Sequence, residues 1–108
     1  MIDSNSFRKL ALSLPHTEEV VHFDRAGFKV IGRRMFASYL AKDNTANIFL
    51  NPSEQKLFCR IDKRSIYPLP NKWGQKGVTT FVLDSVEMEV VTEALQSAYN
   101  DVISTTKK

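Results

Sequence analysis

Residues 28–50 read FKVIGRRMFASYLAKDNTANIFL, and the architecture follows from this stretch. Its β-branched and aromatic residues fall into short runs that predict strands over residues 28–31, 35–40 and 46–50. Gly32 and Arg33 separate the first two runs, and the glycine supplies the positive φ of a two-residue hairpin turn. Asp43 and Asn44 form a second turn before the last run. The stretch therefore predicts consecutive antiparallel strands joined by short hairpins.

The residues before this stretch predict one helix and one further strand. A helix over residues 4–14 follows from the helical spacing of its apolar residues, and Pro15 ends it; these residues are Phe7, Leu10, Ala11 and Leu14. Residues 18–23 predict a short strand, and residues 24–27 predict a break before the next strand.

The residues after this stretch begin with a helix signal. Asn51 predicts an N-cap, with Pro52 at the first helical position and Glu54 able to reach back to the cap. We expect this helix to run to about Asp62 and to bury a stripe formed by Leu57, Phe58 and Ile61. Residues 66–77 are rich in turn formers and have no regular pattern, whereas residues 78–83 predict a strand.

A second helix signal ends the chain. Asp84 predicts an N-cap with Glu87 at the third helical position, and Leu83 is placed to pack on Met88 across the cap. Helical spacing then places one apolar stripe on the sheet, made of Met88, Val91, Leu95, Ala98, Tyr99 and Val102. The expected order is helix, three or four strands, helix, one or two strands, helix. This order predicts an α+β two-layer sandwich, an antiparallel sheet with helices packed on one face.

Composition limits the class of protein. The chain has 108 residues, 43% of them apolar and 25% charged, which predicts a single globular domain over residues 1–108. No apolar run approaches the length of a membrane span and the N-terminus lacks a signal-peptide pattern, so we expect a cytoplasmic protein with no membrane partner. The lone cysteine, Cys59, excludes an intramolecular disulfide. We expect a monomer by default.

Charge is unevenly distributed along the chain. Residues 25–76 hold eleven Lys and Arg residues against three acids, a net charge of +8, although the whole chain carries only +3. Residues 77–106 hold five acids and no base, a net charge of −5. A basic centre of this kind predicts an anionic partner.

An ordered series of short motifs resembles the MmcQ/YjbR family over nearly the whole chain. The series consists of Leu14-Pro15, Glu18-Glu19, Phe28-Lys29-Val30, Gly32-Arg33, Met35-Phe36-Ala37, Asn71-Lys72-Trp73 and Ala98-Tyr99. The resemblance implies a two-layer α+β fold similar to frataxin and to type III secretion chaperones. It also implies a family largely without assigned activity, for which DNA binding through winged hairpins has been proposed. Residues 74–77 make this loop longer than the family pattern.

Side chains capable of catalysis or metal binding are present but poorly spaced. His16 and His22 match no common metal-ligand spacing, and we expect them to be structural or surface residues. Arg60 and Lys63 would lower the pKa of Cys59, yet no base is placed to activate this thiol. Glu89 and Glu93 form a like-charged pair on a solvent-facing helix surface. We therefore predict no catalytic residues, no metal, no cofactor and no enzymatic activity.

The leading hypothesis is nucleic-acid binding, to DNA or another nucleic acid. The candidate contact residues are Lys29, Arg33, Arg34, Lys63, Arg64, Lys72, Trp73 and Lys76. Trp73 either stacks on bases or folds inward to pin its loop, and we expect the inward arrangement because a lone Trp in a small domain is usually buried. The competing hypothesis is a protein-interaction module or chaperone-like adaptor that docks a protein or peptide.

Overall fold

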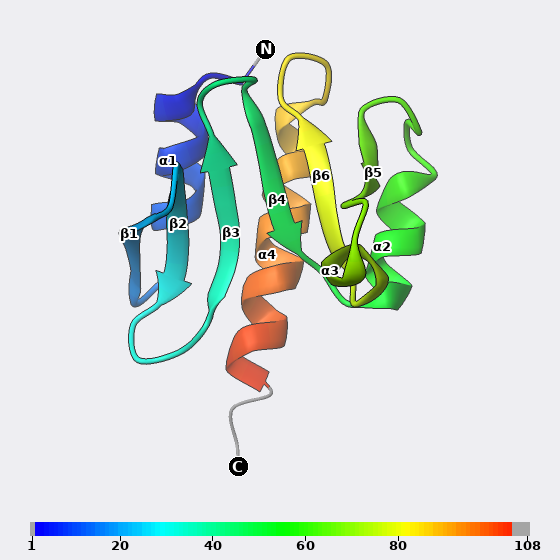
Figure 1. Cartoon of the computed structure of the whole chain (residues 1–108). Coiled ribbons are helices and arrows are strands. Elements are labelled where there is room, and N and C mark those ends of the chain that lie inside the picture. Colours follow the sequence, from blue (N-terminus) through cyan, green and yellow to red (C-terminus); the bar gives the residue numbers. More distant parts are fainter. Residues whose placement is uncertain (1, 105–108) are drawn as a thin grey trace.

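The protein forms one antiparallel sheet with helices on one side (Figure 1). The computed structural model describes residues 2–104. Its elements are α1 (Ser4–Leu12), β1 (Thr17–His22), β2 (Arg25–Val30), β3 (Met35–Leu40), β4 (Thr45–Phe49), α2 (Pro52–Cys59), β5 (Ile66–Pro68), α3 (Lys72–Gln75), β6 (Val78–Val82) and α4 (Met88–Ser104). The six strands are ordered β1-β2-β3-β4-β6-β5. The predicted α+β class and helix-on-sheet layering are confirmed. No helix within the described residues is long and apolar enough to span a bilayer.

The strands at the start of the sheet are joined by turns that differ from the prediction. The expected break over residues 24–27 is wrong, because Arg25 and Ala26 already pair with His22 and Val21 of β1. The β1–β2 turn is therefore only Phe23 and Asp24. The β2–β3 turn is longer than expected and spans residues 31–34. Gly32 in that turn has the expected positive φ, 81°.

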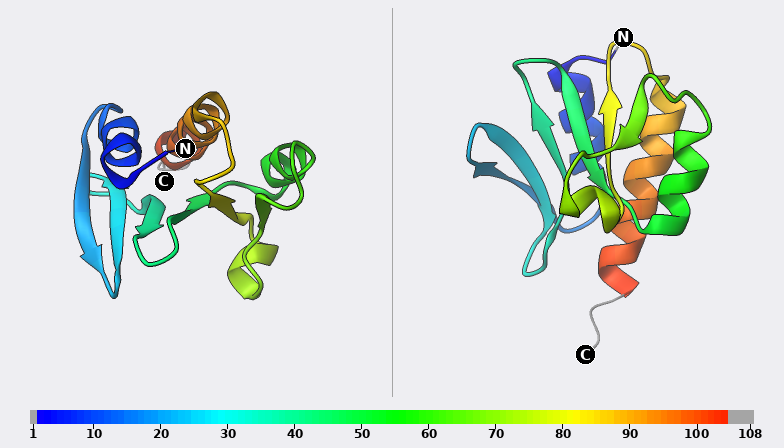
Figure 2. Two further views of the ribbon diagram at one scale, coloured as in Figure 1. Left: turned by 90° about the horizontal axis from the view of Figure 1, so that it is seen from above. Right: turned by 45° about the vertical axis from the view of Figure 1, so that its right-hand side comes forward.

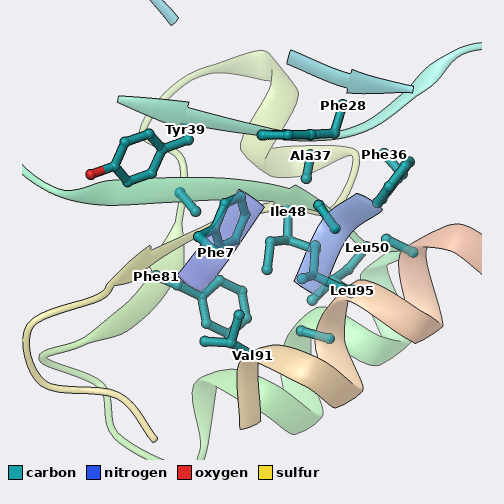
Figure 3. Packing of buried hydrophobic residues seen from close by; sticks show 14 of the residues in the cluster. Phe7, Phe28, Phe36, Ala37, Tyr39, Ile48, Leu50, Phe81, Val91 and Leu95 are labelled. Carbon is teal, nitrogen blue, oxygen red and sulfur yellow. The ribbon is translucent and has the colours of Figure 1, made fainter. Parts of the chain in front are cut away.

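The hydrophobic core lies between the sheet and the helices α1 and α4 (Figure 3). Phe7 of α1 is fully buried, and its ring lies 5.6 Å from Phe28 and 5.8 Å from Tyr39, centroid to centroid. Val91 and Leu95 of α4 contribute to the same cluster. Strands β4 and β6 contribute Ile48 and Phe81, neither of which is exposed. The helical spacing of α1 and α4 thus identified the residues that join the two layers.

Helix α2 contradicts the predicted apolar stripe. Phe58 is buried, but Leu57 and Ile61 are 57% and 56% exposed. The Gln55 side chain determines which face turns inward, since its Nε2 donates to the carbonyl oxygens of Gly74 at 2.9 Å and Val78 at 3.1 Å. Leu57 is two positions later and so faces away from that contact. Ile61 lies beyond the helix, which ends at Cys59.

The N-terminus of α4 also differs from the prediction. The helix begins at Met88 rather than just after Asp84. Asp84 does not act as the predicted cap; its Oδ1 accepts a hydrogen bond of 2.8 Å from Asn44 Nδ2 in the β3–β4 turn. The expected packing of Leu83 on Met88 is wrong as well, because Met88 is exposed and Val86 fills the core position. The tight turn after β6, in which Val86 N donates to Val82 O, sets this geometry.

Candidate functional site

The side of the sheet opposite α1 and α4 forms a trough. Viewed from above, the β1–β2 hairpin and α3 both project on the side opposite α1 and α4 (Figure 2). Between them lies a pocket of about 370 Å³, lined by residues of both walls and of the strands between them. The term "trough" below means this pocket with its two walls, Phe23 on the hairpin and Trp73 on α3.

The floor of the trough is polar at its centre. Strand register aligns one row of residues across all six strands: Val20, Gly27, Ser38, Asn47, Thr80 and Tyr67. Because side chains alternate along a strand, this row faces away from the core residues next to it in sequence. Ser38, Asn47 and Thr80 are buried at its centre. Thr80 Oγ1 donates to Asn47 Oδ1 at 2.8 Å, and Asn47 lines the pocket.

The α3 wall presents Trp73 to solvent. Asn71 Oδ1 caps the short helix by accepting hydrogen bonds from the backbone nitrogens of Trp73 at 2.8 Å and Gly74 at 3.4 Å. Gly74 is buried against the backbone of Leu69 and receives the Gln55 contact, so the inward side of α3 is fully occupied. The predicted inward Trp73 is therefore wrong, and its side chain is 57% exposed.

Two of the predicted basic residues lie beside Trp73. Lys76 Nζ lies 5.0 Å from the centroid of the Trp73 ring, within cation–π range. A second pocket, of about 230 Å³, is lined by Arg34, Trp73 and Lys76 among others, and it shares Phe49, Trp73 and Val78 with the trough. Arg34 Nη2 is 3.3 Å from Asp101 Oδ2 of α4 in an exposed ion pair. Arg34, which is distant in sequence, thus meets Trp73 and Lys76 at one end of the trough.

The other predicted contact residues are more scattered. Arg33 is exposed in the β2–β3 turn next to Arg34, and Lys72 is exposed at the start of α3. Lys29 stands opposite Glu18 in the β1–β2 register. Lys63 and Arg64 lie in the α2–β5 turn, at the end of the sheet opposite α3 (Figure 1). The structure therefore separates this last pair from the residues around Trp73.

Two residues of the trough were missed by sequence reasoning. Phe23 is 89% exposed, has a φ of 60°, and its ring lies 4.9 Å from that of His22. Arg25 also lines the trough, and its buried Nη1 has no hydrogen-bond partner among the described residues. A two-residue turn at Phe23 and Asp24 would have placed Arg25 on the same face as Gly27 and Lys29. The alternation of side chains along residues 25–29 could have identified Arg25, but the predicted break over residues 24–27 obscured it.

Cys59 and the histidines form no centre of their own. Cys59 is half-buried and packs against the core, and this burial raises the pKa of its thiol. The expected lowering of this pKa by Arg60 and Lys63 is wrong, because the side chain turns toward the core. Among residues 2–104, no three His, Cys, Asp or Glu side chains are grouped as a metal site requires.

The raised pKa predicts that the Cys59 thiol reacts slowly. Because the thiolate is the reactive form, Cys59 in the folded protein should react with an aromatic disulfide reagent more slowly at neutral pH than the same chain in urea, which exposes the thiol. The rate should keep rising with pH beyond the range in which an ordinary cysteine is fully ionised. Stopped-flow absorbance gives both rates, and a native rate equal to the denatured rate would contradict the burial of Cys59.

Comparisons with known proteins agree on the architecture. Residues 12–101 match the family model described as YjbR. The fold is similar to the crystal structure of the Deinococcus radiodurans protein DR2400, a DUF419 domain, with a TM-score of 0.85 and 23% sequence identity. That alignment covers 100% of this chain and 83% of the other. No curated protein matches the sequence.

Proposed function

The chain belongs to the YjbR family, and we propose that it is a binding protein for nucleic acid, with no catalytic role. The observation that supports this most directly is Trp73, exposed on the trough wall with Lys76 over its ring and Arg34 at the same pocket. An exposed aromatic ring stacks on bases, while adjacent cations neutralise phosphates. The trough and the basic side chains of Arg34 and Lys76 beside it form the proposed contact surface.

The distribution of charge supports the same surface. The β2–β3 turn and α3 bring Arg33, Arg34, Lys72 and Lys76 to one end of the sheet, whereas the acids of residues 77–106 lie mainly on α4 and the turn before it. One ion pair, Arg34 with Asp101, joins the two groups. Exposed pairs of this kind contribute at most about 1 kcal/mol. A phosphate can therefore compete with Asp101 for Arg34.

A second candidate function is docking of a protein, and α2 favours it. Leu57 and Ile61 are apolar side chains left more than half exposed on or just after this helix. Exposed apolar side chains that lie together are a common feature of protein-interaction sites. If nucleic acid fails to bind, this surface becomes the leading candidate.

The salt dependence of binding tests the nucleic-acid proposal. Log K for a labelled single strand should fall linearly with log[salt], by about 0.7 per phosphate neutralised, and by about 0.9 for a duplex. Neutralising Arg34 and Lys76 together, as Arg34→Gln with Lys76→Gln, should weaken binding and flatten the slope by about 1.5 units, because two phosphate contacts are lost. Fluorescence anisotropy at several salt concentrations measures both quantities.

The α2–β5 turn offers a control with the same change in charge. Lys63→Gln with Arg64→Gln also removes two positive charges, but at the end of the sheet away from Trp73. We expect this pair to change the slope much less. Equal effects of the two pairs would show that net charge alone drives binding, and absence of binding at low salt, where screening is weakest, would refute the proposal.

A further inference from the structure

We propose that the trough receives one unpaired base of a single strand, which stacks on Trp73 while Phe23 closes the opposite side. This inference rests on the proposed nucleic-acid function and specifies the form of nucleic acid that the site takes. Four features of the described residues support it: the size of the pocket, the pair of aromatic walls, the strained backbone of Phe23 and the positive charge of Arg25 at the lining.

The size and lining of the trough suit a planar aromatic group. Its volume of about 370 Å³ lies within the range of small-molecule pockets. Met35, Phe49 and Val78 add apolar surface beneath the two aromatic walls. Buried Ser38 and Asn47 lie on the floor and offer a few polar atoms to the edge of a ring. Apolar walls with a small number of polar groups are what a base needs for stacking and for contacts at its edge.

Phe23 carries a backbone cost that packing does not explain. Its φ of 60° lies in the left-handed region, which bulky residues avoid. Positive φ at the first position of a two-residue hairpin turn favours glycine. The ring is 89% exposed, so burial does not offset the strain, and it packs edge-on against the ring of His22 at 4.9 Å. Strain retained at an exposed aromatic residue on a pocket wall indicates a role in binding.

Arg25 supplies the charge complementarity. Its Nη1 is buried without a hydrogen-bond partner among the described residues, which is costly for a charged group. The residue lines the trough two positions after Phe23 in sequence. The positive charge of this guanidinium at the trough lining complements the phosphate of a bound nucleotide.

Stacking in the trough requires a base that is free of its neighbours. In a duplex both faces of every internal base are covered and its pairing edge is occupied, whereas a single strand exposes both. We therefore expect a preference for single strands over duplex at equal phosphate number.

Three labelled probes of equal length separate base recognition from phosphate attraction: an oligothymidylate, a strand of abasic sites and a hairpin duplex. We expect the abasic strand to bind about tenfold more weakly than the oligothymidylate, from the loss of base stacking. Trp73 is the only tryptophan, so its fluorescence reports on the trough directly. Saturation with oligothymidylate should quench this fluorescence, and saturation with the abasic strand should not.

The variant Phe23→Gly tests the aromatic wall without threatening the fold, because glycine suits the positive φ at this position. It should weaken oligothymidylate binding by about fivefold to tenfold and leave the abasic strand unaffected. Trp73→Ala should do the same. The matched control is Val21→Ala, which changes an equally exposed apolar residue on the other face of β1.

The outcomes distinguish this inference from the function on which it rests. Equal affinity for the oligothymidylate and the abasic strand, or equal losses for both probes in Phe23→Gly, would overturn the base site while leaving phosphate-driven binding intact. No binding of any probe at low salt would overturn both.

Discussion

Replacing Phe7 by alanine should lower the free energy of unfolding by about 3–5 kcal/mol, the range for truncating a buried phenylalanine. Phe7 is the residue through which α1 enters the core, and it is fully buried between Phe28 and Tyr39. Truncation loses both ring contacts and leaves a cavity that the sheet beneath it cannot easily fill. Urea denaturation followed by circular dichroism measures the change.

The control for Phe7→Ala is the same change at a phenylalanine that is exposed to solvent. Phe23→Ala removes the same atoms from a side chain that is 89% exposed, so we expect a change below about 0.5 kcal/mol, as for surface substitutions. A loss below about 1 kcal/mol for Phe7→Ala would contradict the packing of α1 on the sheet shown in Figure 3.

Gly77→Ala should destabilise the protein by about 2–5 kcal/mol, because it combines backbone strain with overpacking. Gly77 joins α3 to β6 at a φ of 118°, which side chains of L-residues rarely adopt. A Cβ placed there would lie 2.0 Å from the carbonyl oxygen of Leu50. The contact is with backbone, so relief requires β6 and α3 to move away from the end of β4. Urea denaturation measures the loss, and Trp73 fluorescence should shift as α3 moves.

Gly32→Ala tests the cost of backbone strain without the steric clash that Gly77→Ala would add. Gly32 also has a positive φ, 81°, but no atom lies within 4 Å of the position of an added Cβ. We expect about 1 kcal/mol of destabilisation from strain alone. If the two glycine variants lost equal stability, the close approach of Gly77 to Leu50 would not exist in solution.

Most of the sheet was predictable because its signals are local. The run at residues 35–40 coincides with β3, and Asn51 caps α2 as expected, its Oδ1 accepting from Glu54 N at 2.9 Å. The apolar spacing of α4 identified its buried face from Val91 to Val102. Each of these features depends on residues within one turn or one strand of each other.

The errors fall where a long-range contact overrides the local pattern. Leu57 and Ile61 looked like core residues, but Gln55 bonds to Gly74 and Val78 and turns α2 so that Leu57 faces solvent. Trp73 looked like a core residue by composition, but the inward side of α3 is already used by the backbone contact of Gly74 with Leu69. A 3.6-residue period of apolar residues identifies the buried face of a helix only when the helix has several turns. Helices α2 and α3 are too short for this pattern to be reliable.

The sequence by itself determined the α+β class, the consecutive hairpins, the membership suggested by its motifs and the basic character of residues 25–76. These follow from residue spacing, turn chemistry and charge, all of which are properties of neighbours in the chain. Only the tertiary structure decided that Phe23, Arg25 and Trp73 line one trough and that Arg34 and Lys76 stand at its end. The reason is that curvature of the sheet and the docking of α3 bring together elements far apart in sequence, and no local pattern encodes that distance.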